Sequence, residues 1–139
     1  MFNTIVKNIL IFLSFIANFS FAQDGENPLP YVHQEAKFDT APRFPGGEEA
    51  MMKYFADNII YPQPEKTKGL QGYVSLKFDV TKDGKIINIM ATNGVPGAQN
   101  LVKEAIRIIK NMPAWIPANK NGIAVDVIEY NLNVPFKIK

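Results

Sequence analysis

Apolar and polar side chains alternate over residues 74–80, which predicts a β-strand with one buried face. Gly72 stands just before this run, and Asp83-Gly84, a pair typical of hairpin turns, comes just after it. Apolar residues resume over 86–90, where they occupy both faces. We therefore predict an antiparallel hairpin whose return strand is bulged or partly covered. Its first strand should bury Val74, Leu76, Phe78 and Val80.

A second alternating run spans residues 128–138 and follows a further turn signal, Asn121-Gly122. Because Pro135 has no N–H, this last strand is predicted to have one unpaired edge at that end. The side facing the core is predicted to consist of Ile128, Tyr130, Leu132, Val134, Phe136 and Ile138. The opposite side is predicted to consist of Glu129, Asn131, Asn133 and Pro135.

Two further segments have apolar residues at helical spacing. The first helix should begin after the turn Phe44-Pro-Gly46-Gly47 and end near Ile60, because Pro62 disfavours helical geometry in the residue before it. A glycine-rich loop before a helix can bind phosphate. Here Glu48-Glu49 occupy the place of an anion, so Gly46 and Gly47 are interpreted as a capping turn.

The second helix is predicted over residues 98–112 and ends at Pro113. A short helical turn is expected over 64–68. Trp115 stands between prolines, and we interpret it as a core residue closing the helix–strand loop before Pro117; an exposed binding anchor is the alternative. The consistent fold is α+β, with a small antiparallel sheet of about three strands and two helices packed on one face.

The first residues have the features of an export signal: a basic residue, Lys7, an apolar run over 9–16 and small residues up to Ala22. We predict a cleaved signal peptide over 1–22, with a retained anchor as the alternative. Residues 23–43 are proline-containing and lack apolar periodicity, which favours a flexible tether. Residues 44–139 then form one domain.

Composition excludes several classes of function. The chain has no cysteine, and its one histidine, His33, lies in the predicted tether, so neither a thiolate or multi-histidine metal site nor a histidine-based catalytic triad is expected in the core. No cofactor is expected. Without Lys7, 14 basic residues (15 less 1) face 13 acidic residues, a balance that gives no electrostatic footprint for nucleic acid. We expect a binding module and not an enzyme.

The order of these elements over about 44–139 resembles the C-terminal domain of the TonB family. The hairpin, the helix, Trp115-Ile-Pro117, Asn121-Gly122 and the long last strand carry the resemblance. It implies a periplasmic module that contacts outer-membrane transporters by pairing its last strand with a short transporter segment, the TonB box. From residues alone, an edge protected by Pro135 and charges is the alternative. The residues implied to contact a partner are Tyr61, Pro62, Asp126, Val127, Glu129, Asn131 and Asn133.

The chain departs from the family pattern at three places. Only Tyr61-Pro62 match the Gln-Pro-Gln-Tyr-Pro stretch that contacts transporters, so a helix stop with a packed tyrosine is an equal interpretation. Ala118 replaces the glycine of Trp-x-Pro-Gly. Asn18 stands where the membrane anchor of a full energy transducer has a histidine, and asparagine cannot change charge with proton flow.

Three alternatives to a transporter-binding domain with a cleaved signal follow from the sequence. One is an anchored component of a proton-driven motor at the inner membrane. Another is a domain that self-associates as a homodimer through its last strand. The third is a binding module for a different envelope protein. In the first case alone the protein would contact a membrane, through residues 1–22.

Overall fold

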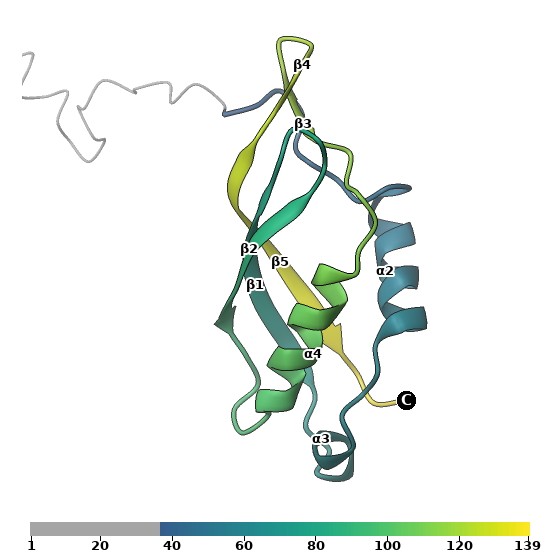
Figure 1. Cartoon of the computed structure of the whole chain (residues 1–139). Helices are drawn as coiled ribbons and strands as arrows, with labels where there is room; N and C mark the ends of the chain where they lie inside the picture. Colours follow the sequence, from purple (N-terminus) through teal and green to yellow (C-terminus); the bar gives the residue numbers. More distant parts are fainter. Residues whose placement is uncertain (1–36) are drawn as a thin grey trace, which may run out of the picture. The chain divides into compact units, whose positions relative to one another are not determined.

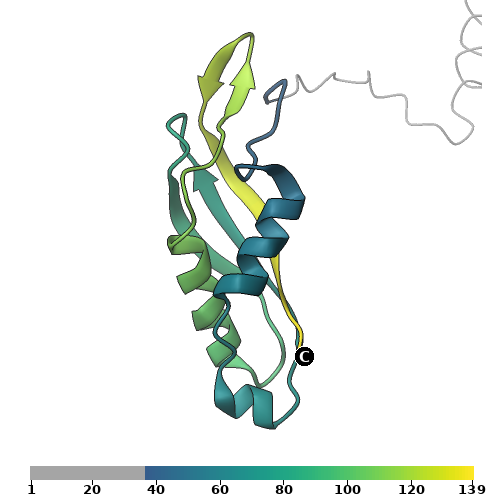
Figure 2. The same ribbon diagram turned by 90° about the vertical axis from the view of Figure 1, so that its right-hand side faces the viewer.

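The computed structural model describes residues 37–139. Three antiparallel strands form one sheet in the order β2 (Ile86–Asn93), β1 (Gly72–Val80), β5 (Val127–Phe136). Two helices, α2 (Gly47–Asn58) and α4 (Gln99–Lys110), cover one face of it (Figure 1, Figure 2). The short helix α3 (Gln63–Thr67) lies in the link between α2 and β1. The predicted α+β fold, with three strands and two helices on one face, is confirmed.

The core lies between the sheet and the two helices. Val74, Leu76, Phe78 and Val80 are buried, as the alternation predicted. Helix α4 contributes Leu101, Ala105, Ile108 and Ile109, whereas α2 contributes only Phe55 as a fully buried side chain. Each buried Leu, Ile, Val or Phe side chain stabilises the fold by about 1.5–3 kcal/mol relative to exposure. Helix α4 is therefore the main helical part of the core, and α2 contributes fewer buried side chains to it.

Both outer strands are irregular, although the sequence suggested this only for β2, and the irregularity in β5 changes which side chains face the core. The register of β5 on β1 shifts between Phe78 and Val80, where Glu129 has a φ of 55°. The extra residue reverses the alternation at the start of β5: Val127 is 4% exposed and Ile128 is 58% exposed. The prediction that Ile128 faces the core was therefore wrong. The predicted bulge in β2 is observed, with register shifts against β1.

A second, two-stranded sheet was not predicted. Strands β3 (Ala118–Lys120) and β4 (Ile123–Val125) pair around Asn121-Gly122, whose φ angles of 52° and 77° suit a two-residue hairpin turn. The turn was predicted, but three-residue strands are too short to show as alternation. The segment 39–43, which the sequence placed in the tether, bridges this region through Thr40 to Asn119 and Arg43 to Ile116.

The turn between β1 and β2 packs directly on the loop that follows α4. The backbone N–H of Trp115 donates to the Gly84 carbonyl at 2.8 Å. Gly84 has a φ of 80°, and a Cβ there would lie 2.0 Å from the Trp115 carbonyl oxygen. Only glycine fits this contact. The predicted signal peptide and most of the predicted tether lie outside the described residues, so both remain predictions.

Candidate functional site

Strand β5 lies at one edge of the sheet, and among residues 37–139 only β1 pairs with it. An edge strand presents a row of backbone N–H and C=O groups that can pair with another chain. Pro135, paired with Tyr73, lies near the end of this strand as the sequence predicted. The outer side of β5 is therefore the first candidate for a binding site.

The side chain of Thr92 shows which backbone groups of β5 point outward. Its hydroxyl donates to the Ser75 carbonyl at 3.2 Å, so the Ser75 backbone faces β2. Ser75 is paired with Asn133 on its other side. Since antiparallel pairs alternate between bonded and non-bonded, the N–H and C=O of Asn133 must point away from β1. The same alternation turns Asn131 and Pro135 outward, which suits a proline without an N–H.

The beginning of β5 differs, because its polar groups are used within the fold. The Glu129 N–H donates to Asp79 Oδ1 at 2.9 Å, and its carbonyl accepts from Asn131 Nδ2 at 3.3 Å. The Glu129 carboxylate accepts from Lys77 Nζ at 2.9 Å. The Asn88 amide, followed by the Glu129 N–H, holds the pKa of Asp79 below its ordinary value. The open edge therefore begins after Glu129.

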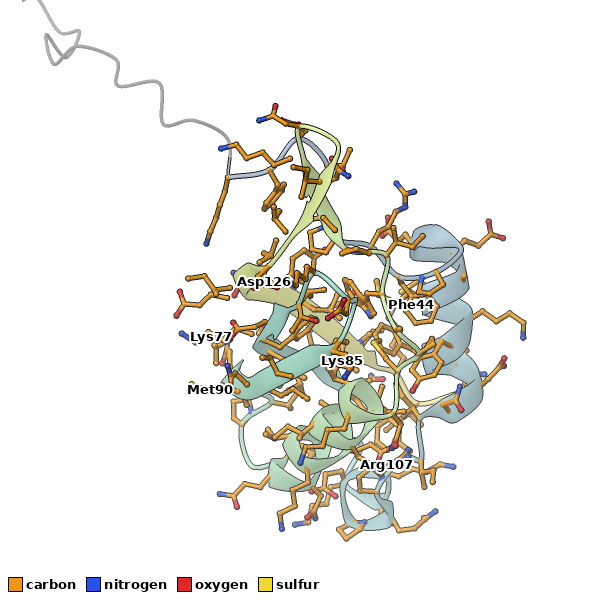
Figure 3. All side chains as sticks on the ribbon, turned by 45° about the horizontal axis from the view of Figure 1, so that its top comes forward. Phe44, Lys77, Lys85, Met90, Arg107 and Asp126 are labelled. Atoms are coloured by element: carbon orange, nitrogen blue, oxygen red, sulfur yellow. The ribbon has the colours of Figure 1, made fainter. Side chains whose placement is uncertain are left out.

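Two of the predicted partner-binding residues, Asp126 and Val127, also belong to this closed end. Asp126 Oδ1 accepts from the Lys82 N–H at 2.6 Å and so fixes the β1–β2 turn, while Val127 is buried. Figure 3 shows Asp126 where β5 begins. The structure thus separates the seven predicted residues into two groups at opposite ends of the strand.

The second group contains Tyr61-Pro62, which lie near the end of β5. The Tyr61 ring meets the Phe136 ring edge to face, with centroids 5.9 Å apart, and its hydroxyl donates to the Leu70 carbonyl. Burial, then the nearby charge of Glu65, raises the pKa of Tyr61. Its contacts match a tyrosine packed beside a helix stop. The ring still lines a groove with Pro135, so Tyr61 borders the open edge.

An ion pair that was not predicted from the sequence holds the link between α2 and β1 in place. The Glu104 carboxylate accepts from the Ile60 N–H at 2.7 Å and from Arg107 Nη2 at 2.7 Å, and Arg107 also donates to the Asn58 carbonyl at 2.9 Å. Figure 3 shows Arg107 where α4 meets this link. Burial opposes ionisation of Glu104, but these hydrogen bonds and the Arg107 charge outweigh it and lower its pKa. The sequence contained a sign of this ion pair: residue 104, a glutamate, falls on the apolar face of the helix that begins at Leu101.

Trp115 supports the fold and does not reach the open edge. It is 3% exposed, and its ring meets those of Phe44, Phe78 and Tyr130 with centroids 6.4, 5.6 and 5.4 Å apart. An exposed binding anchor would need accessible ring atoms. In this structure Trp115 is therefore a core residue, and the candidate site consists of the outward edge from Asn131 to Pro135 with Tyr61 beside it.

Within residues 37–139, no group of three His, Cys, Asp or Glu side chains is arranged to hold a metal ion. No helix in the same range has the length and hydropathy needed to cross a bilayer. No curated protein matches the chain significantly. A family model described as the Gram-negative bacterial TonB protein C-terminal matches residues 57–138, more than half of the chain and all of the sheet. The chain therefore belongs to this family of periplasmic, non-enzymatic domains, which take part in TonB-dependent transport across the cell envelope.

Proposed function

We propose that this domain binds an extended segment of an outer-membrane transporter by adding it as a fourth strand to the outward edge of β5. The observation that carries the proposal is the orientation of Asn133, whose backbone N–H and C=O point away from β1. Strand addition uses such groups for affinity and leaves specificity to side chains. Family membership makes a transporter the expected source of the segment.

The open edge is short, which limits how much main-chain pairing can contribute. It offers the N–H and C=O groups of Asn131 and Asn133 and the carbonyl of Pro135, and the bulge at Glu129 ends it on the other side. Each net hydrogen bond contributes about 0.5–1.5 kcal/mol. Five such bonds give a few kcal/mol before the cost of association, so side-chain contacts have to supply the remainder.

An NMR titration of the protein with TonB-box peptides from transporters of the same cell tests this proposal. We expect the largest amide shifts at Asn131, Leu132, Asn133 and Val134, with smaller shifts at Tyr61. Shifts confined to the β1–β2 turn or to α4 would contradict strand addition at β5. Mass that rises with protein concentration, with no response to any peptide, would indicate pairing between two copies instead.

Two substitutions at one position separate the backbone from the side chain. Asn133→Pro removes an outward N–H without removing a bond to β1, so the fold should persist while peptide affinity falls about tenfold or more. Asn133→Ala keeps the N–H and removes only the side chain that contacts Ser75 Oγ, so its affinity should stay within about threefold of the unchanged protein. Equal affinity of Asn133→Pro and the unchanged protein would sink the proposal.

A further inference from the structure

A groove of about 360 Å³ lies beside the open end of β5. Helix α2 contributes Met52, Phe55 and Ala56 to its lining, followed by Ile59 just after the helix, and the sheet contributes Pro135 and Tyr73. Met52 is 45% exposed and Tyr73 is 59% exposed, which is high for large apolar side chains. The groove has the size and apolar lining of a site that accepts a large side chain or a small molecule.

The rim of this groove is positively charged. Lys66 from α3 and, from the segment after β5, Lys137 and Lys139 line it, and no Asp or Glu side chain does. Among the described residues none of these lysines forms an ion pair. Two acidic side chains from the elements that form the groove have partners of their own: Asp57 pairs with Lys53 at 2.5 Å, and the buried Glu65 accepts from the Asn100 N–H through one carboxylate oxygen. An acidic group entering here would be attracted by these lysines. The buried Glu65 carboxylate opposes part of that attraction, since burial and then the Glu65 charge raise the pKa of Tyr61.

The opposite end of the open edge has no such run of unpaired lysines, because the Glu129 carboxylate there is paired with Lys77 at 2.9 Å. Glu129 lies just before Asn131, and Asp126 lies three residues earlier. A bound strand with a carboxylate at one end would be favoured with that end beside Lys66 and Lys137 over the end beside the Lys77–Glu129 pair. The charges along β5 can therefore set the direction of an added strand, which main-chain pairing alone leaves open, since a strand can be added parallel or antiparallel.

We propose that this groove is a side-chain subsite for the added strand. It takes one large apolar or aromatic side chain from the peptide residue beside Pro135, and an adjacent acidic side chain of the same peptide pairs with Lys66 or Lys137. The inference rests on the proposed strand addition at β5. Main-chain pairing weakens at Pro135, which offers only a carbonyl. The subsite adds side-chain contacts at this position, where main-chain hydrogen bonds become fewer.

Matched peptides test the occupant of the groove. The parent is a heptapeptide with alternating apolar residues, carrying Phe at the position beside Pro135 and Glu next to it. Replacing Phe with Ala should weaken binding about tenfold, and replacing Glu with Gln about threefold. Only the second effect should shrink at high salt. A peptide series in which neither change alters affinity overturns the subsite.

Variants of the protein identify where those side chains bind. Ala56→Trp fills the groove and should remove the advantage of Phe over Ala in the peptide, whereas Glu49→Trp, on the same helix outside the groove, should leave it intact. Lys137→Glu should lower the affinity for the Glu-containing peptide and raise the affinity for a peptide with Lys in place of that Glu. Lys68→Glu makes the same charge change outside the groove and should alter neither affinity. Identical responses of the groove variants and their controls overturn the assignment.

The two proposals fail differently. If Asn133→Pro weakens binding but the groove variants and peptide changes have no effect, strand addition stands and the subsite is wrong. If the groove variants matter but Asn133→Pro does not, the groove binds peptide without strand addition and both proposals are overturned. If Ala56→Trp abolishes a concentration-dependent dimer and peptides never bind, a second copy occupies the groove and the peptide subsite is wrong.

Discussion

The two halves of β5 belong to one strand but use their backbone differently. At the beginning of the strand, Glu129 is bonded to Asp79 and Lys77, and Asp126, just before the strand, is bonded to the β1–β2 turn. From Asn131 to Pro135 the outward groups have no strand beside them among the described residues. A single bulge separates these halves. The comparison shows that an edge strand can be closed over part of its length, so that pairing with a partner is confined to the remainder.

This division predicts that substitutions in the two halves of β5 should have different effects on stability and on peptide affinity. Changes at the closed half, or in the turn and loop that support it, should lower stability without altering the affinity of the folded protein for peptide. Changes at the open half should lower affinity without altering stability. Three substitutions test the closed half and the link beside the open half, in decreasing order of expected effect.

Gly84→Ala should have the largest effect. The added Cβ would lie 2.0 Å from the Trp115 carbonyl oxygen, and the φ of 80° is itself unfavourable for alanine. We expect the free energy of unfolding to fall by about 3 kcal/mol or more, measured by urea denaturation. Peptide affinity of the remaining folded fraction should not change, because the turn does not touch the open edge.

Gly122→Ala is the matched control for that substitution. Gly122 has a similar φ of 77°, but a Cβ there would meet nothing within 4 Å. Only the backbone strain should remain, about 1–2 kcal/mol. Equal losses in the two variants would show that the contact between the turn and Trp115 does not hold the closed end together.

The sequence indicated the parts of the fold that depend on local pattern. Alternation identified β1, and helical spacing identified α2 and α4. The turns predicted at Asp83-Gly84 and Asn121-Gly122 are observed at those positions. The bulge at Glu129 was not predictable in the same way, because Asp79 and Lys77, which stabilise it, lie on another strand. Ile128 was misplaced for that reason: alternation assumes a regular strand, and a bulge shifts the register by one residue.

The candidate site was predictable only at the level of the strand. Sequence reasoning grouped residues from both halves of β5, because nothing in the chain shows which backbone groups point outward. That direction depends on pairing with β1, shown here by the contact of Thr92 with Ser75. The groove beside Pro135 depends on α2 and α3 meeting the end of β5, so its residues are scattered through the sequence.

Glu104→Gln should have an intermediate effect, because the carboxylate holds the link that carries Tyr61. Loss of its charge weakens the bonds to Arg107 and the Ile60 N–H, and we expect stability to fall by about 2 kcal/mol at pH 7. The folded pKa of Glu104 lies below its ordinary value of 4.5. The stabilisation is therefore present above that value and is lost as the pH falls through the folded pKa.

Urea denaturation midpoints measured at several pH values test this pH dependence of the stabilisation by Glu104. The difference between Glu104→Gln and the unchanged protein should shrink as the pH falls below about 4.5. Asp57→Asn, which removes an exposed pair with Lys53, should change stability by less than about 0.5 kcal/mol at any pH. Since Glu104 supports a residue beside the groove, a modest loss of peptide affinity should accompany its variant but not the control. A constant stability difference across pH would contradict the role of the ionised carboxylate.

The smallest effect bears most directly on why the two halves of β5 differ. If Asp79 closes the first half by accepting from the Glu129 N–H, Asp79→Ala should lower stability by only about 0.5–1 kcal/mol but speed hydrogen exchange of the Glu129 amide several-fold. Asp79→Asn keeps an acceptor and should preserve protection. The folded pKa of Asp79 lies below 3.8, so protection of Glu129 is complete above that value and is lost as the pH falls through the folded pKa, relative to Asp79→Asn at the same pH. The Asn133 amide should exchange quickly in all three proteins until peptide is added. If Glu129 exchanged as fast as Asn133 in the unchanged protein, the bulge would not close the edge, and a longer partner strand would be expected to pair along all of β5.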